Sequence, residues 1–98
     1  MISVVNITAK TIAMNIRCIR EFRQYTQHYL GVKLGISQNA YSKIELGNST
    51  LNIDKLILIS KILEVKLAYI VSNDYNQVFN LYKERLDQKI LRVFGVMP

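Results

Sequence analysis

The chain has 98 residues, half of them hydrophobic, and its 13 Lys and Arg against seven Asp and Glu give a net charge of +6. This length suits one domain with a modest core, and the hydrophobic fraction excludes a disordered chain. The single cysteine excludes a disulfide framework, no apolar run approaches the roughly 20 residues of a membrane span, and no signal peptide pattern is present. We therefore expect a soluble, cytoplasmic protein, and its basic charge suits a polyanionic partner without requiring one.

The first seven residues are short and rich in β-branched side chains, and we assign residues 1–7 to an N-terminal arm. A first helix is expected to begin at Thr8 or Thr11, because either side chain can accept hydrogen bonds from free backbone N–H groups. The helix continues through IAMNIRCIREFRQ, in which Ile12, Ile16 and Ile19 recur at helical spacing.

Two short helices follow, separated by only a few residues. Thr26 is expected to cap the first, which ends at Gly35, a residue that can adopt the left-handed conformation. Ser37 then caps QNAYSKIEL, which ends at Gly47. Two helices joined by so short a turn form the helix-turn-helix arrangement, and Gly31 would let them approach closely.

The second helix of this pair is a candidate for reading DNA bases. Its residues Tyr41 and Ile44 are expected to face the interior, so that a polar face points outward. The residues of this outward face are Gln38, Asn39, Ser42 and Lys43. Amide side chains at the start of an exposed helix can form bidentate hydrogen bonds with base edges in a major groove. The alternative is that all four are ordinary solvated residues.

The remaining helices complete the expected domain. Asn52 should cap IDKLILISKIL, and a short helix, LAYIV, follows Lys66. The apolar face of the longer of these two helices is expected to be broad and buried, with Ile53, Leu56, Ile57, Ile59, Ser60 and Leu63. The sequence therefore predicts an all-α, five-helix domain over residues 8–72, followed by a C-terminal helix within residues 73–98.

The C-terminal helix, expected from residue 76 to residue 94, lies beyond this core. One apolar seam runs along it at steps of three or four, formed by Phe79, Tyr82, Leu86, Ile90 and Val93. We interpret the seam as a dimerisation element, because two-fold pairing would serve the reading of a pseudo-palindromic site. The alternative is that the helix packs back on its own domain.

From Ile12 to about Val71 the sequence resembles the Cro/repressor-type (XRE) helix-turn-helix family. The similarity is carried by IRCIREFRQYTQHYLGVKLGISQNAYSKIELGN and NIDKLILISKILEVKLAYIV. It implies a repressor-like fold that binds double-stranded DNA. Arg20, seven residues before Gln27, corresponds to the family's buried Arg, and Glu45 corresponds to its acidic partner. The resemblance thus implies a structural ion pair between Arg20 and Glu45.

The same resemblance implies contacts with the DNA phosphates. The corresponding positions are Gln27, Ser37, Asn48, Ser49 and Thr50. A helix N-terminus at Gln27 favours an anion in any case. For Gln27 the alternative is that it is only the first residue of its helix. For Asn48, Ser49 and Thr50 the alternative is an ordinary polar loop. Other cationic residues, Lys10, Arg17, Arg23 and Lys33, are expected to be scattered surface charge.

The sequence departs from the family pattern at four positions. Gly31 stands where Ala is usual, Gln24 where Gly is frequent, and Leu51 where Pro is common. Leu46 occupies a position from which a polar residue often reaches DNA. These changes leave the motif in place.

No pattern in the sequence indicates catalysis. It contains no Gly-rich phosphate loop and no paired carboxylates, and nothing beside His28 or Cys18 would form a base, nucleophile or metal site. We therefore expect no enzyme activity, no cofactor and no metal. The leading hypothesis is a sequence-specific, repressor-like transcriptional regulator that binds DNA as a homodimer. The alternative is a protein-interaction module or antitoxin-like protein on the same scaffold, which binds a protein partner through its C-terminal helix.

Overall fold

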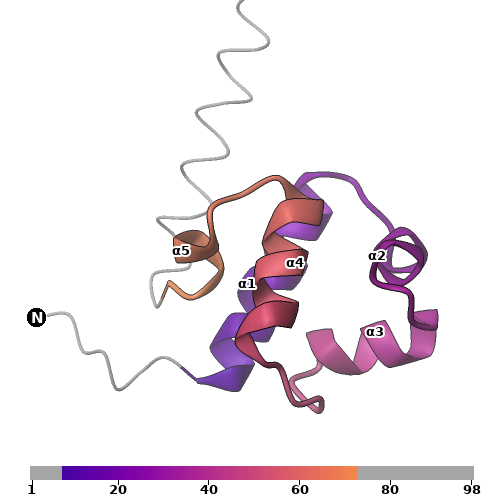
Figure 1. The fold of residues 1–98 in the computed structure, drawn as a ribbon, viewed down its shortest axis with the longest axis horizontal. Helices are drawn as coiled ribbons and strands as arrows, with labels where there is room; N and C mark the ends of the chain where they lie inside the picture. Colours follow the sequence, from indigo (N-terminus) through magenta and orange to yellow (C-terminus); the bar gives the residue numbers. More distant parts are fainter. Residues whose placement is uncertain (1–7, 73–98) are drawn as a thin grey trace, which may run out of the picture.

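A computed structural model describes residues 8–72, and these form five α-helices without a strand (Figure 1). The helices are α1 (Ala9–Phe22), α2 (Gln27–Leu34), α3 (Gln38–Glu45), α4 (Ile53–Leu63) and α5 (Leu67–Ile70). The predicted all-α class is confirmed. The expected arm, 1–7, and the expected C-terminal helix with its apolar seam lie outside the described residues.

The first four helices each begin at a residue whose side chain caps the helix. Thr8, Thr26, Ser37 and Asn52 accept hydrogen bonds from the backbone N–H groups three residues further on, at 2.7–3.1 Å. Each cap satisfies one N–H that has no partner within the helix. Of the two expected starts for the first helix, Thr8 is the one that the structure uses. The other three caps are confirmed.

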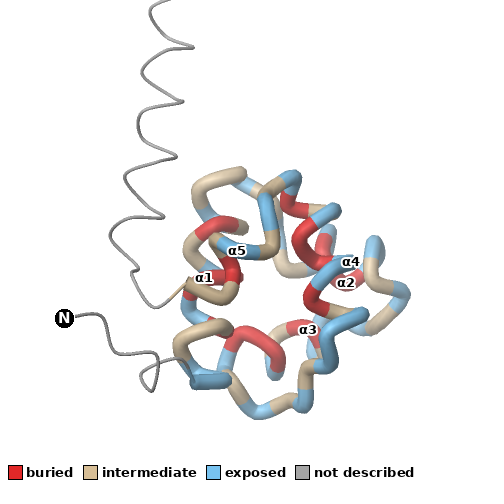
Figure 2. The backbone as a smooth tube through the Cα atoms, turned by 60° about the vertical axis from the view of Figure 1, so that its left-hand side comes forward, coloured by how far each residue is buried: buried red, intermediate tan, exposed pale blue. Residues whose placement is uncertain are grey.

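All five helices contribute to one core. Its buried members are Ile16, Ile19, Leu30, Tyr41, Ile44, Leu56, Ile59, Leu63 and Ile70. In Figure 2 the buried stretches of the helices face the middle of the domain, and the exposed stretches lie around it. The side chain of Ile36, from the turn between α2 and α3, packs against this core from its edge.

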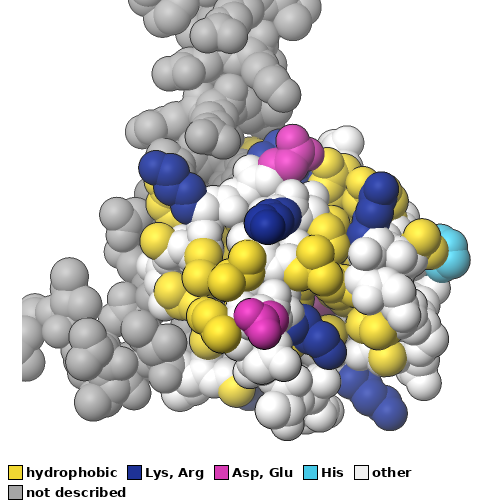
Figure 3. All heavy atoms as spheres, viewed as in Figure 1, with side chains coloured by type: hydrophobic (Ala, Val, Ile, Leu, Met, Phe, Trp, Pro, Cys, Tyr) yellow, Lys and Arg dark blue, Asp and Glu magenta, His cyan; other side chains and the backbone are white. Residues whose placement is uncertain are grey.

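The expected broad buried face of α4 is wrong at two positions. Leu56, Ile59 and Leu63 are buried, but Ile53 is 58% exposed and Ile57 is 38% exposed. The reason is that α4 packs against α2 and α5, which cover one stripe of the helix, while Ile53 and Ile57 lie one turn apart on its uncovered flank. Hydrophobic side chains accordingly lie on the face of the domain on which α4 is exposed (Figure 3).

Arg23 was expected to be surface charge, and this expectation is also wrong. Its Nε donates to the carbonyl of Leu63 and its Nη2 donates to the carbonyl of Glu64, both at 2.9 Å. These carbonyls belong to the end of α4, where the last backbone acceptors lack partners within the helix. The guanidinium therefore joins the end of α1 to the end of α4.

Candidate nucleic-acid interface

The α2–α3 pair has the geometry of a helix-turn-helix. Three residues separate the helices, and Gly35 adopts a left-handed φ of 71°. A Cβ on Gly31 would lie 3.0 Å from the carbonyl oxygen of Ile36, so the turn approaches α2 closely enough to favour glycine there. Tyr41 and Ile44 are at most 1% exposed and attach α3 to the core. The opposite face of α3 is consequently directed outward.

That outward face holds the four residues expected to read bases. Gln38, Asn39 and Lys43 are exposed, and Ser42 is half-buried. The two amide side chains lie in the first turn of α3, and Lys43 lies one turn further along the same side. The structure thus brings these side chains together on one surface, from which they could meet base edges.

Charge favours an anionic partner at this surface. Between Gln27 and Asn52 the sequence contains one acidic residue, Glu45. Its side chain is only 3% exposed and is paired with Arg20. The exposed surface of the helix-turn-helix therefore carries cationic and neutral side chains, with no carboxylate to repel a phosphate.

The Arg20–Glu45 pair fixes α3 against α1. Arg20 Nε lies 2.6 Å from Glu45 Oε2, and Arg20 Nη2 donates to Glu45 Oε1 at 3.0 Å. This bidentate geometry is the strongest arrangement for an arginine and a carboxylate. Arg20 Nη1 also donates to the carbonyl of Tyr25 at 2.8 Å, in the corner between α1 and α2. The pair that the sequence predicts is thus present, and it also holds the start of the α2–α3 unit.

Two further donors complete the partners of Glu45. The hydroxyl of Tyr41 donates to Oε2 at 2.5 Å, and Nε2 of Gln27 donates to Oε1 at 3.1 Å. Side chains from α1, α2 and α3 therefore converge on one carboxylate. We call Arg20, Gln27, Tyr41 and Glu45 the Glu45 network.

The electrostatics of the Glu45 network keep the carboxylate charged. Burial acts to raise the pKa of Glu45, but hydrogen bonds from Arg20, Tyr41 and Gln27 outweigh it and hold that pKa below its ordinary value. Burial and the hydrogen bond to Glu45 raise the pKa of Tyr41, so its hydroxyl stays protonated and donates. The hydrogen bond to Glu45 likewise raises the pKa of Arg20.

The residues expected to contact phosphates lie around α3, and several of their polar groups already have partners. Gln27 donates to Glu45, and Ser37 Oγ accepts the N–H of Ala40. The backbone N–H of Asn48 donates to the carbonyl of Lys43 at 3.0 Å. Asn48 and Thr50 are exposed, with Ser49 half-buried between them.

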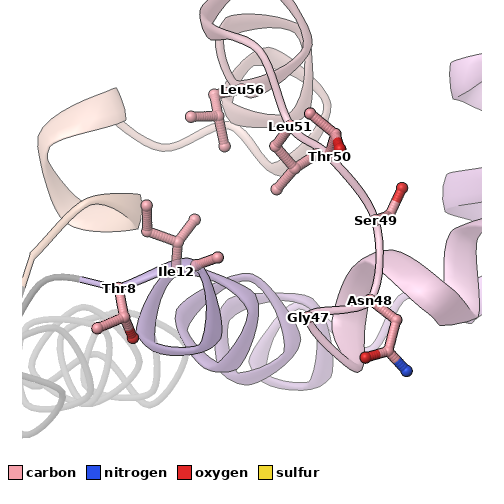
Figure 4. A pocket seen from close by; sticks show the side chains of 9 residues that line it. Thr8, Ile12, Gly47, Asn48, Ser49, Thr50, Leu51 and Leu56 are labelled. Carbon is pink, nitrogen blue, oxygen red and sulfur yellow. The ribbon is translucent and has the colours of Figure 1, made fainter.

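A pocket of about 620 Å³ lies between this loop and the start of α1 (Figure 4). Its lining is formed by Thr8, Ala9, Ile12, Gly47, Asn48, Ser49, Thr50, Leu51 and Leu56. The side chains of Ile12, Leu51 and Leu56 border the hollow, whereas that of Asn48 points away from it. The polar side chains of the lining are the hydroxyls of Thr8, Ser49 and Thr50 and the amide of Asn48.

Residues 8–72 contain no cluster of three or more His, Cys, Asp or Glu side chains able to hold a metal ion. Among the same residues, no helix has the length and apolar character needed to cross a membrane.

Sequence reasoning missed two residues that carry much of this geometry. Tyr41 was assigned to the core alone, although its position four residues before Glu45 places both side chains on one face of α3. Asn15 was assigned no role, although it falls within the apolar stripe of α1 and is 1% exposed. A polar residue inside an apolar stripe is the signal that could have identified it.

Comparison with known proteins places this arrangement in a family. The sequence pattern of the helix-turn-helix family matches residues 19–70. The chain is also 36% identical over 63 residues to YqaE, an uncharacterised HTH-type transcriptional regulator of Bacillus subtilis (strain 168). The matched part covers 64% of this chain and 54% of YqaE, so the chain spans about half the length of that relative. No solved structure matches the chain. Because the family pattern covers more than half of its residues, the chain belongs to the XRE-type helix-turn-helix family.

Proposed function

We propose that the protein is a sequence-specific, repressor-like transcriptional regulator that reads the major groove of double-stranded DNA with α3. The observation that carries the proposal is the outward face of α3, where Gln38, Asn39 and Lys43 are exposed on a helix held by the Glu45 network. Amide side chains can pair bidentately with adenine, and Lys can contact guanine. An α-helix is narrow enough to enter the groove.

Phosphate contacts would hold α3 in register. The proposed contacts are Gln27, Ser37, Asn48, Ser49 and Thr50. The side-chain amide of Gln27 has two N–H donors, of which Glu45 uses one, so the other is able to reach a phosphate. In this proposal Glu45 orients Gln27 while Gln27 contacts the DNA backbone.

The protein would act as a homodimer through Phe79, Tyr82, Leu86, Ile90 and Val93. Two copies related by a two-fold axis would place their α3 helices about 34 Å apart, one turn of DNA, to read two half-sites. The regulator hypothesis needs no enzyme activity and no cofactor.

A second candidate function is a protein-interaction module on the same scaffold. The observation that favours it is exposed apolar surface: Leu46, at the end of α3, is 63% exposed, and Ile53, at the start of α4, is 58% exposed. Under this hypothesis a protein partner would bind the domain, and the polar face of α3 would have no DNA ligand.

Selection of genomic fragments by the purified chain, followed by salt titration on the selected duplex, separates the two candidates. A dimer that touches about 6–10 phosphates should lose roughly three to five decades of affinity between 50 and 200 mM salt. Failure to select any duplex, or tight binding that ignores salt, would contradict DNA recognition and favour the interaction module.

A further inference from the structure

Every acceptor position of the Glu45 carboxylate is occupied by a donor of the Glu45 network. Oε1 accepts hydrogen bonds from Arg20 Nη2 at 3.0 Å and from Gln27 Nε2 at 3.1 Å. Oε2 accepts hydrogen bonds from Arg20 Nε at 2.6 Å and from the Tyr41 hydroxyl at 2.5 Å. An ionised carboxylate offers about four acceptor positions, two on each oxygen. These hydrogen bonds therefore leave Glu45 without room for a further donor.

Tyr41 is a fixed donor in this arrangement. Its side chain is 0% exposed and lies in α3, four residues before Glu45. Because burial and the hydrogen bond to Glu45 raise the pKa of Tyr41, its hydroxyl stays protonated. The hydroxyl thus keeps one acceptor position of Oε2 filled.

Gln27 is the member of the network that faces both Glu45 and the surface. It is half-buried at the first position of α2, and its side-chain amide carries two N–H groups. Since a carboxylate only accepts hydrogen bonds, the amide turns its nitrogen toward Glu45, and one N–H donates to Oε1. Glu45 has no acceptor position left for the second N–H, which is therefore left for an acceptor outside the network.

We propose that Tyr41 is a positioning residue for the phosphate contact of Gln27. By filling the second acceptor position of Oε2, the Tyr41 hydroxyl prevents Glu45 from taking both N–H groups of the Gln27 amide. Without this hydroxyl the buried Oε2 would lack a donor, and the second N–H of Gln27 would turn inward to supply one. The phosphate contact rests on the proposed function, whereas the arrangement of the Gln27 amide does not.

Nuclear magnetic resonance of the Gln27 side-chain amide in the full chain tests this arrangement without DNA. In the unaltered protein we expect one N–H resonance to be shifted downfield by the hydrogen bond to Glu45 and the other to resemble a solvent-exposed amide. Tyr41→Phe removes only the hydroxyl. In this variant the second resonance should also move downfield, and its N–H should exchange with solvent at least about tenfold more slowly. A Gln27 amide that is the same in both proteins would overturn the proposal.

Tyr25→Phe is the matched control, because it also removes a hydroxyl that donates to a carboxylate, that of Glu64 at 2.9 Å. It should leave the Gln27 amide unchanged. If Tyr41→Phe does not fold, a fluorinated tyrosine at position 41 replaces it, since fluorine makes the hydroxyl a stronger donor. The bonded N–H of Gln27 should then move upfield, because Glu45 gives more of its charge to the hydroxyl, and no movement would overturn the proposal.

Binding to the selected duplex tests the consequence for DNA. In the unaltered chain Gln27→Ala should weaken binding about tenfold, which is typical for the loss of a hydrogen bond to a charged group. In the Tyr41→Phe background the same change should cost less than about threefold, because the phosphate contact is already lost. Equal costs in the two backgrounds would contradict the positioning role. If Gln27→Ala has no effect in the unaltered chain, the proposed phosphate contact fails, and the resonance measurement still decides whether Tyr41 positions Gln27.

Discussion

Glu45 is the residue on which the arrangement of the helix-turn-helix depends most. Its carboxylate accepts hydrogen bonds from Arg20, Gln27 and Tyr41, which come from three helices. The Arg20 partner was predictable, because the family resemblance pairs these positions. Tyr41 lies four residues before Glu45 on the same helix, so its contact could also have been read from the spacing, whereas Gln27 meets Glu45 only once α2 packs against α3.

Removing one partner of the buried pair should leave the other charge without compensation. We expect Arg20→Met and Glu45→Leu each to lower the free energy of unfolding by about 3–5 kcal/mol. The double variant should recover much of this loss, because no unpaired charge remains. Denaturant unfolding of the four proteins measures the coupling.

The matched control for this cycle is the ion pair of Arg17 and Glu21, in which Arg17 Nε lies 3.2 Å from Glu21 Oε1. Their side chains are 62% and 55% exposed. Arg17→Met and Glu21→Leu should each change stability by less than about 1 kcal/mol. If the losses from Arg20→Met and Glu45→Leu simply add in the double variant, the proposed coupling is contradicted.

At the scale of the elements, local signals predict where helices begin and end. The four capping side chains and the glycines at positions 35 and 47 act on neighbouring backbone, so their effects can be read without the fold. The flank of α4 could not be read in this way, because burial of Ile53 and Ile57 depends on which helices pack beside α4. Two connections also use non-glycine residues in the left-handed region, Gln24 (φ 61°) and Glu64 (φ 57°).

Gln24→Gly should stabilise the domain. A side chain in the left-handed region costs about 1–2 kcal/mol, and the greater freedom of glycine in the unfolded chain offsets part of the gain. We expect a net increase of about 0.5–1 kcal/mol in the free energy of unfolding. Thermal and denaturant melts measure it.

Glu64→Gly is the comparison for this prediction. This substitution relieves similar backbone strain, because Glu64 also lies in the left-handed region. It also removes the hydrogen bond that the Tyr25 hydroxyl donates to the Glu64 carboxylate at 2.9 Å. Its gain should therefore be smaller than that of Gln24→Gly. A loss of stability in Gln24→Gly would show that the side chain of Gln24 has a role that outweighs its strained backbone.

At the scale of the whole molecule, the five helices of residues 8–72 form a core that closes at Ile70. The sequence predicted this core from helical periodicity, because its apolar residues recur along each helix at the spacing of one face. Asn15 shows the limit of such reasoning. Its partners lie 55 and 57 residues further along the chain, and no local pattern relates them.

The C-terminal seam gives a prediction for the assembly. Because we propose that residues 79–93 pair two copies of the chain, sedimentation of residues 1–98 should report a dimer. A chain ending at Asn73 should be monomeric and helical, with much weaker binding to a two-half-site duplex. A truncated chain that remains dimeric would place the interface within the described domain. One that unfolds would show that the segment packs on its own domain.

The central claim is that the outward face of α3 reads bases. The most direct test is to measure how tightly Gln38→Ala and Asn39→Ala bind the selected duplex and a random duplex of equal length. Gln24→Ala is the matched control, since Gln24 is an exposed amide outside α3. Each α3 variant should lose about 1–3 kcal/mol of binding on the selected duplex and almost nothing on the random one, while the control changes neither. Equal losses on the two duplexes, or no loss on either, would contradict base reading by α3.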